Sequence, residues 1–526
     1  MAESEFLKLP PELILACLAN LPVTDLVSCL QCGNRLLRDI ILKSVLLRYR
    51  REQERAGVQE NPHVASNLVI ADRLEQLLRR EANWLSFTPR STHTIPIDFQ
   101  TTGLYDLTSD VYLVGDAPNP NTHMCTGIKY TYTSPGSDGP QWRAVDGGKS
   151  IIDFGTAFEE HDLIAMVTYT PHDHNPQVAS IDVLLLSFST GASHPLAAHP
   201  TLHIHDVEVT RNRPGVSIEI VGQTLALSLV YWSYELRDMD TLHLYNWKSG
   251  AMKMDPFPVY NTGLVFLTHD ILVLPNSVEE SLDVYHIPED DKLPRSLLSF
   301  HLPELVQSTF ILSIQCRGAP NPRGASVRRP SRAAFLPRPS DAILLFSFQI
   351  GNPTGATEHM FVVHRGLFAA SINLSLAEGE DDENPQIDVE WEAWGPRCTH
   401  WLDAAELSTQ YITTTAGQRL VTIAHEAPET PAPIRMLDFN AASVETQLRT
   451  RGLAAVDGPH AVVRAVKASS QHPAFFERPI VSELPYVETT SKRMFDYGAV
   501  LINDENIIGA RFGDRTVEEL EVLHFG

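Results

Sequence analysis

The spacing of apolar residues divides this chain into two parts. Between residues 9 and 47, apolar side chains recur every three or four positions, which predicts short amphipathic helices. From about residue 95, the spacing shortens to two, and proline, glycine and β-branched residues become frequent, which predicts strands joined by turns. A short helical segment is therefore expected to precede a much longer region of strands.

Prolines set the expected boundaries of the first helices. A helix is predicted to begin at Pro10 and Pro11, because the first turn of a helix has unpaired N–H groups and proline lacks this group. Pro22 is predicted to end this helix, and Thr24 to cap a second one. A third apolar stripe spans residues 36–45. A unit this small buries little surface by itself, so we expect it to share an apolar face with a partner.

One further helix is expected between this segment and the strands. It is predicted over residues 61–87, with Asn61 as its cap and Pro62 at its start. Leu74, Leu77 and Trp84 lie on its apolar side. This helix would connect the two parts of the chain.

The strand-rich part repeats a simple unit of two strands. The expected pairs are 162–167 with 181–188, 224–230 with 241–247, 270–274 with 281–287, 342–348 with 359–364, 419–425 with 433–439, and 498–503 with 506–511. Repeated units of this kind stack on one another, and antiparallel four-stranded units favour a β-propeller. We therefore predict a mixed fold, with all-α helices followed by an all-β domain, a degenerate propeller of six or seven blades. A pair of β-sandwiches is the alternative.

Two polar stretches interrupt the predicted blades, near residues 318–340 and 376–390. The first is rich in arginine and proline, and the second contains the acidic run 378–383. Both compositions are typical of flexible loops that do not pack. In the alternative interpretation, the first would contact an acidic target and the second would capture a basic one.

Composition narrows the classes of partner. The 526 residues carry a net charge of −24, which argues against binding to nucleic-acid phosphates or to an anionic membrane surface. The sequence shows no basic leader followed by an apolar run, and no apolar run long enough to span a bilayer. We therefore expect an intracellular protein of the cytoplasm, the nucleus or both, with no nucleic-acid or membrane partner.

Residues with metal-binding or catalytic chemistry do not form a recognised motif. Cys29 and Cys32 have the spacing of a zinc or redox pair, but no second pair accompanies them, so we expect them to be small core residues. No matching ligand motif accompanies the histidines considered as metal ligands, which are His172, His174, His199, His203 and His205. Nucleotide-binding glycine loops and the nucleophile-elbow motif are also missing. We expect no metal, no cofactor and no catalytic residue.

The first fifty residues resemble an F-box. The family's signals fall in order on Leu9-Pro10, Glu12-Leu13-Ile14, Leu21-Pro22 and Asp25-Leu26. Two positions depart from the family pattern, because Leu36 stands where tryptophan is usual and Gly33 where cysteine is common. The resemblance implies docking on a Skp-type adaptor, which links F-box proteins to a cullin and its RING subunit. The residues that it assigns to adaptor binding are Leu9, Pro10, Leu13, Ile14, Leu18, Leu21, Pro22, Asp25, Leu26 and Leu36.

Later strings extend the resemblance over nearly the whole chain, to a large family of F-box proteins from mushroom-forming fungi. These strings are WEAWGP at 391–396, DFN at 438–440 and DENIIG at 504–509. We expect them to be structural. Trp394, Trp401 and Phe439 are predicted to lie in the core, and Gly395-Pro396 and Asn440 in turns.

These observations predict an F-box at 1–50, a linking helical segment at 51–94 and a propeller-like domain at 95–526. The resemblance implies a substrate-recognition subunit of an SCF-type ubiquitin ligase, which holds a protein target and catalyses no reaction itself. One alternative is a scaffold that binds the adaptor without ubiquitin transfer. Another is a propeller enzyme, which would require charged residues converging at the mouth of a central channel. The sequence does not specify the target or the residues that contact it.

Overall fold

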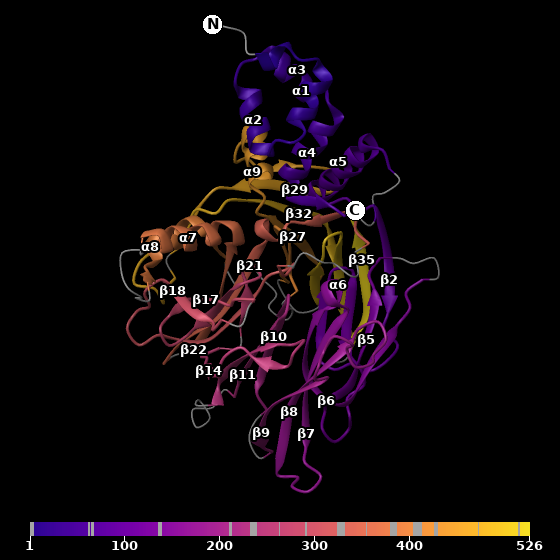
Figure 1. Cartoon of the computed structure of the whole chain (residues 1–526), viewed down its shortest axis with the longest axis vertical. Helices are drawn as coiled ribbons and strands as arrows, with labels where there is room; N and C mark the ends of the chain where they lie inside the picture. The colour runs from indigo at the N-terminus through magenta and orange to yellow at the C-terminus, as the bar shows by residue number, and fades with distance from the viewer. Residues whose placement is uncertain are drawn as a thin grey trace.

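The computed structural model describes residues 5–526 except 62–63, 65–67, 135–138, 210–212, 232–238, 262, 290–291, 323–331, 354, 379–386, 403–412, 426–429, 472 and 514–515. The N-terminal helices gather at one end of the molecule, and antiparallel sheets fill most of the rest (Figure 1). None of the described helices combines the length and the apolar character that crossing a membrane requires.

The N-terminal segment contains η1 (Glu5–Lys8), α1 (Pro11–Leu18), α2 (Val23–Gln31), α3 (Arg35–Lys43) and α4 (Val45–Ala56). The predicted start of the first helix is confirmed, because Pro10 is its N-cap. Its predicted end is wrong, since α1 ends at Leu18 and Pro22 is instead the N-cap of α2. Thr24 therefore lies in the first turn of α2 and does not cap it.

The third apolar stripe is divided between two helices. Asn34 caps α3 by accepting a hydrogen bond from Leu37 N at 3.1 Å, and Ser44 caps α4 by accepting one from Leu47 N at 3.3 Å. Val45 therefore belongs to α4 and not to the third helix. The core shared by these helices consists of Ile14, Leu18, Leu26, Leu37, Ile41 and Leu47.

The linking segment contains the end of α4 and a strand before its own helix. β1 (Val58–Glu60) pairs with β20 (Phe335–Pro337), and α5 spans Ile70–Ser86. The predicted helix start at Asn61 is wrong, because α5 begins at Ile70. The Asn61 side chain is instead buried and donates to Ala333 O at 2.8 Å. Part of the stretch 318–340 that was predicted to be a flexible loop is thus an ordered strand. Residues 323–331 of that stretch, and 379–386 of the predicted acidic loop, lie outside the described residues.

The remaining strands form sheets that follow one another along the chain. The first sheet contains β3 (Tyr105–Thr108), β4 (Val111–Gly115), β5 (Cys125–Tyr132), β6 (Arg143–Ala157), β7 (Leu163–Pro171), β8 (Val178–Ser187) and β9 (Thr201–Glu208), with α6 (Phe158–His161) between β6 and β7. The second contains β10 (Gly215–Val221), β11 (Thr224–Val230), β12 (Thr241–Asn246), β13 (Ala251–Met252) and β14 (Phe257–Pro258). The third contains β15 (Val265–Phe266), β16 (Ile271–Asn276), β17 (Ser281–His286) and β18 (Arg295–His301), and β23 (Ile387–Val389) pairs in parallel with β18.

Three further sheets complete this series. The fourth contains β19 (Phe310–Arg317), β21 (Ile343–Asn352), β22 (Gly355–His364) and β24 (Thr399–Leu402). The fifth contains β25 (Thr415–Ala416), β26 (Arg419–Ile423), β27 (Ala432–Asp438), β32 (Tyr486–Phe495), β29 (Ala461–Val466) and β28 (Val456–Asp457), and β30 (Ser469–Gln471) pairs separately with β31 (Ile480–Ser482). The last contains β33 (Ala499–Ile502), β34 (Asn506–Phe512), β35 (Val517–His524) and β2 (Ser91–Pro96). All six strand pairs predicted from the sequence form antiparallel neighbours here.

Helices inserted among the strands show that the prediction of an all-β domain is wrong. They are α7 (Arg365–Glu378), α8 (Trp391–Cys398) and α9 (Ala441–Arg451), with the single turn η3 (Pro339–Asp341) before β21. Gly395 and Pro396, which were expected in a turn, lie inside α8. Asn440 caps α9 by accepting a hydrogen bond from Ser443 N at 2.8 Å. The core positions predicted for Trp394, Trp401 and Phe439 are confirmed.

Most of the apolar cores lie between sheets that are neighbours in chain order. One core joins Ile181 of β8 to Leu227 of β11, and the following sheets share cores in the same way. A further core contains Tyr112 of β4 together with Leu501 of β33. The last sheet therefore packs on the first one.

The last sheet also contains the earliest strand of the strand-rich region. β2 pairs with β35 from Ser91 opposite His524 to Pro96 opposite Glu519, and the two strands run side by side in Figure 1. Ile95 of β2 is fully buried in the core that joins the last sheet to the first. The two ends of the strand region are therefore held together by backbone hydrogen bonds and by apolar packing.

We expect Ile95→Ala to lower the free energy of unfolding by about 2–5 kcal/mol, because it leaves a cavity in the core that joins the last sheet to the first. Thr94→Ala is the matched control, since Thr94 is the exposed neighbour on the same strand and its loss should cost less than about 0.5 kcal/mol. Urea unfolding followed by circular dichroism measures both values. Equal midpoints for the two variants would contradict a structural role for β2.

Candidate functional site

The ten residues that the F-box resemblance assigns to adaptor binding fall into two groups. Ile14, Leu18 and Leu26 are at most 1% exposed and form the core of the helices, so they are not accessible to a partner in this structure. Leu13 is 52% exposed and Leu36 is 39% exposed. The remaining exposed members are Leu9, Pro10, Pro22 and Asp25, while Leu21 is half-buried. The buried residues hold the helices together, and the exposed residues lie on the outside of the same helices.

The exposed apolar side chains of this segment are more numerous than the sequence motif indicated. We call the set Leu9, Leu13, Val27, Leu36, Leu42 and Val45 the helical apolar surface, and each member is more than a third exposed. Val27, Leu42 and Val45 were missed because they belong to no family signal. Their positions between the buried residues of the same helices could have identified them, since a helix turns only one side to its core. These six side chains are exposed on a unit whose own core is formed by other residues.

Helix α4 connects this unit to the sheets. Near its middle, Arg50 donates to Ala19 O and Leu21 O at 2.5 and 2.8 Å, which fixes the end of α1. Near its end, Arg55 O accepts from Asn440 Nδ2 at 2.8 Å, and Arg55 Nη2 donates to Thr446 Oγ1 at 2.9 Å. The same helix thus belongs to the core of the N-terminal unit and contacts α9.

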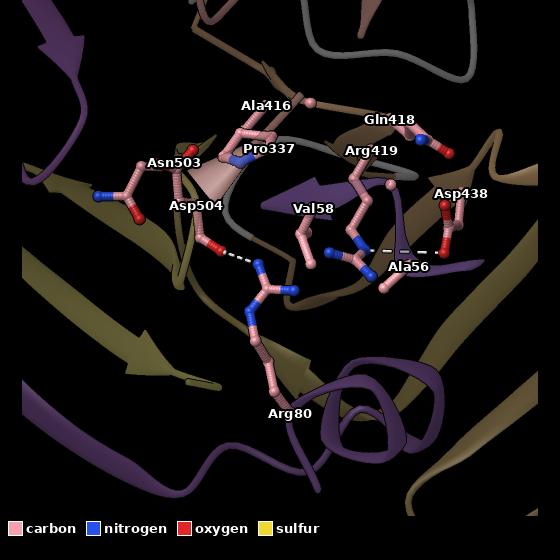
Figure 2. A pocket seen from close by; sticks show the side chains of 12 residues that line it. Ala56, Val58, Arg80, Pro337, Ala416, Gln418, Arg419, Asp438, Asn503 and Asp504 are labelled. Carbon is pink, nitrogen blue, oxygen red and sulfur yellow. Dashed lines mark hydrogen bonds and ion pairs between the residues drawn. The ribbon is translucent and has the colours of Figure 1, made fainter. Parts of the chain in front are cut away.

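A buried cluster of charges fixes α5 to the sheets. Arg419 of β26 lies 2.6 Å from Glu81 of α5 (Nη2 to Oε2) and 3.7 Å from Asp438 of β27 (Nε to Oδ2). Arg80 pairs with Glu81 through Nη1 and donates to Asp504 O at 2.6 Å through Nη2. Figure 2 shows Arg80 and Arg419 extending from the two sides of a small pocket of about 20 Å³. We call this set the charged junction.

Two of these carboxyl groups respond differently to burial. Burial alone would raise the pKa of Glu81, but the guanidinium groups of Arg419 and Arg80 together outweigh it and hold this pKa below its ordinary value. For Asp438 burial is the stronger influence, and it raises the pKa in spite of Arg419. Glu81 is therefore the carboxyl group whose ionised form the two arginines stabilise.

Aromatic packing reinforces the junction. The ring of Trp84 on α5 stacks on Phe525, with centroids 4.2 Å apart, and the guanidinium carbon of Arg419 lies 4.9 Å from the centre of the Trp84 ring. Trp84 is 1% exposed. The linking helix thus packs directly on the C-terminal end of the chain.

Two of the histidines singled out in the sequence lie beside the same carboxylate, because His172 Nε2 is 3.2 Å and His203 Nε2 is 3.8 Å from Asp206 Oδ1. His172 Nε2 lies 2.7 Å from Ser180 Oγ, His203 Nδ1 lies 3.0 Å from Asp182 Oδ1, and His205 Nε2 lies 2.8 Å from Tyr231 OH. Over the described residues, no group of three or more His, Cys, Asp or Glu side chains is arranged to hold a metal ion. All six cysteines are free. Cys29 is half-buried and packs against the core of the N-terminal helices, whereas Cys32 is exposed, so the predicted core position is wrong for Cys32.

Comparison with protein-family models and with curated proteins found no match. Among solved structures, the chain is similar to the WD40 domain of SCAP from fission yeast, with 7% identity, a TM-score of 0.35, and coverage of 83% of this chain and 95% of that one. It is also similar to the β-propeller domain of the Trilobed protease from Pyrococcus furiosus, with 10% identity, a TM-score of 0.29, and coverage of 76% and 95%. A putative 6-phosphogluconolactonase from Bacteroides fragilis shows 9% identity, a TM-score of 0.30, and coverage of 74% and 84%. Similarity at this level carries no conclusion about this chain.

We expect Glu81→Gln to lower the free energy of unfolding by about 3 kcal/mol at pH 7, because it leaves the buried Arg419 and Arg80 without their carboxylate. Glu75→Gln, on the exposed side of the same helix, should change it by less than about 0.5 kcal/mol. Urea unfolding measures both variants.

The pH dependence of this effect follows from the lowered pKa of Glu81. Its stabilising contribution is complete above the pKa of the unfolded chain, roughly 4.3, and is lost as the pH falls through the lower pKa of the folded protein. The difference between wild type and Glu81→Gln should therefore shrink steadily between about pH 5 and pH 2. A difference that is the same at every pH would contradict this assignment.

Proposed function

We propose that the protein is an F-box protein and acts as the substrate-recognition subunit of an SCF-type ubiquitin ligase. The order of the signals from Leu9-Pro10 to Asp25-Leu26 supports the resemblance. The observation that carries the proposal is the helical apolar surface, which leaves six large apolar side chains exposed on a unit whose own core is already filled. A Skp-type adaptor is the partner that the family provides for such a surface.

The proposal assigns different roles to the predicted adaptor-binding residues. Leu9, Pro10, Leu13, Pro22, Asp25 and Leu36 are exposed and would contact the adaptor. Ile14, Leu18 and Leu26 would act indirectly, by holding the helices together. Burying one leucine side chain contributes about 1.5–3 kcal/mol, so a few of these contacts suffice for a stable complex after the costs of association.

For the strand-rich region we propose a seven-bladed β-propeller. The seven-stranded first sheet would supply two blades, β3 to β6 and β7 to β9, and each later sheet would supply one. The core that joins Tyr112 to Leu501 supports a closed ring, because it connects the last sheet to the first. The pairing of β2 with β35 supports the same conclusion, since a blade built from both ends of a domain closes a propeller.

A receptor acts by holding its target at a defined distance from the transferring enzyme. The charged junction and helix α4 suit this task, because they attach the helical unit to the sheets through buried contacts at several points. In the proposed function the loops of the propeller bind the protein target. The protein would act in the cytoplasm or the nucleus, where free cysteines are stable.

Two alternatives make different predictions. A scaffold that binds the adaptor without ubiquitin transfer would leave the level of its bound protein unchanged on depletion, whereas a receptor would let its target accumulate. A propeller enzyme requires charged residues that converge near the centre of the sheets. Asp106, Asp153 and Arg317 line one cavity between several strands, and this is the observation that favours the enzyme alternative. The receptor remains the better proposal because it also explains the helical apolar surface.

We expect Leu13→Glu to weaken binding to a purified Skp-type adaptor at least about tenfold, because it places a charge in an apolar contact. Leu374→Glu is the matched control, since Leu374 is 65% exposed on α7, outside the N-terminal unit, and its substitution should leave the affinity unchanged. Isothermal titration calorimetry with the full-length chain measures both. Failure of the wild-type chain to bind, or full binding by Leu13→Glu, would contradict the proposal.

A further inference from the structure

A cavity of about 230 Å³ lies where several sheets meet. Its wall contains parts of β3, β6 and β10 on one side, and β19, β25 and β33 on the other, together with α6. Because the strands converge here from different sheets, side chains that are far apart in the sequence face one another. The neighbouring segment Gly318–Pro322 completes the wall.

Three carboxyl groups from three different strands face this cavity. Asp106 lies on β3, Asp153 on β6 and Glu219 on β10, and Arg317 at the end of β19 pairs with Asp106. Asn321 Nδ2 donates to Glu219. Asp153 Oδ1 accepts a hydrogen bond from Phe154 N at 2.7 Å, and within the described part of the chain this carboxylate forms no direct ion pair. The Asp153 side chain is therefore a half-buried acceptor at the cavity, and no described cation of the wall pairs with it directly.

The protonation of these carboxyl groups is shifted mainly by burial. Burial, with smaller contributions from Asp106 and Glu219, raises the pKa of Asp153 to about 7, and Arg317 offsets this only in part. Burial also raises the pKa of Glu219. A cation that binds next to such a carboxyl group stabilises its ionised form and lowers its pKa.

The next arginine lies behind the wall and not in the cavity. Arg365 is 1% exposed, and its Nη1 donates to Pro320 O at 2.8 Å and to Pro339 O at 3.1 Å. These bonds hold the wall segment in place. The other ionisable side chains that face the cavity are Tyr105, Glu159, Glu160, Cys316 and Asp504.

We propose that this cavity binds an organic cation, a guanidinium or primary ammonium group on a flexible aliphatic chain, with Asp153 and Glu219 as its principal acceptors. The carboxylates suit the charged end, and the apolar wall residues Leu107, Phe154 and Ile218 suit the methylene stem. The volume is below the usual range for drug-sized ligands, and it fits a single side chain or a small amine. The cation could belong to a protein, as an arginine or lysine side chain, or to a free amine. This inference does not depend on adaptor binding.

The test uses calorimetric titration of the full-length chain with two probes, agmatine and the blocked pentapeptide acetyl-Gly-Gly-Arg-Gly-Gly-amide. We expect at least one probe to bind, and we expect Asp153→Asn and Glu219→Gln to weaken that binding about tenfold or more, because each removes a charge-assisted hydrogen bond. Glu358→Gln, at an exposed position on β22, is the matched control and should bind as wild type does. Binding of the peptide assigns the site to a protein side chain, and binding of agmatine alone assigns it to a free amine.

A second measurement separates a direct role of Asp153 from a loss of folding. Since the pKa of Asp153 is about 7, its protonation below that pH removes the charge that holds the cation, and the affinity of the wild type should fall as the pH decreases from 8 to 6. Asp153→Asn should lose most of this dependence while keeping the circular dichroism spectrum of the wild type. Absence of binding by both probes at about 10 mM, or unchanged affinity in Asp153→Asn, would overturn the inference.

Discussion

The pairing of Arg419 with Glu81 is the interaction on which the arrangement of this molecule depends. It joins the linking helix to a strand of the fifth sheet, in a position where the Arg419 side chain is 11% exposed and the Glu81 side chain 26% exposed. Arg80 and Asp438 complete the set, so that two arginines face two carboxyl groups. A buried ion pair of this kind contributes little net free energy to folding. Separating its two charges is costly, because each would be left buried without a partner. The pair therefore favours the one arrangement of α5 and β26 in which it forms. The helical unit is held in a defined position because α4 and α5 pack on each other and on the sheets.

The strand region depends on contacts between its two ends. β2 enters the last sheet, and the core around Leu501 joins that sheet to the first one. Strand ends from successive sheets consequently converge, which places Asp106, Asp153 and Glu219 around one cavity. The proposed adaptor surface and the proposed cation site lie on different parts of the chain. The two proposals can therefore succeed or fail separately.

Much of the local structure could be predicted from the sequence. The strand pairs were found because residues such as those of β11 are β-branched or apolar and are bounded by turns. The inserted helices were missed for a physical reason. In α8 the buried residues Trp391, Trp394 and Cys398 do follow helical spacing, but the run is short and contains Gly395 and Pro396, which normally mark a turn. The cavity could not be predicted, because its carboxyl groups come from strands that only the tertiary fold brings together.

The charged junction should make α5 and the sheets open as one unit. Native-state hydrogen exchange of the full-length chain measures the free energy of opening for each segment. Amides in α5 should open with the same free energy as those in β34 and β35, within about 1 kcal/mol. Exchange of α5 at a much lower free energy than β35, as for an independently moving segment, would contradict it.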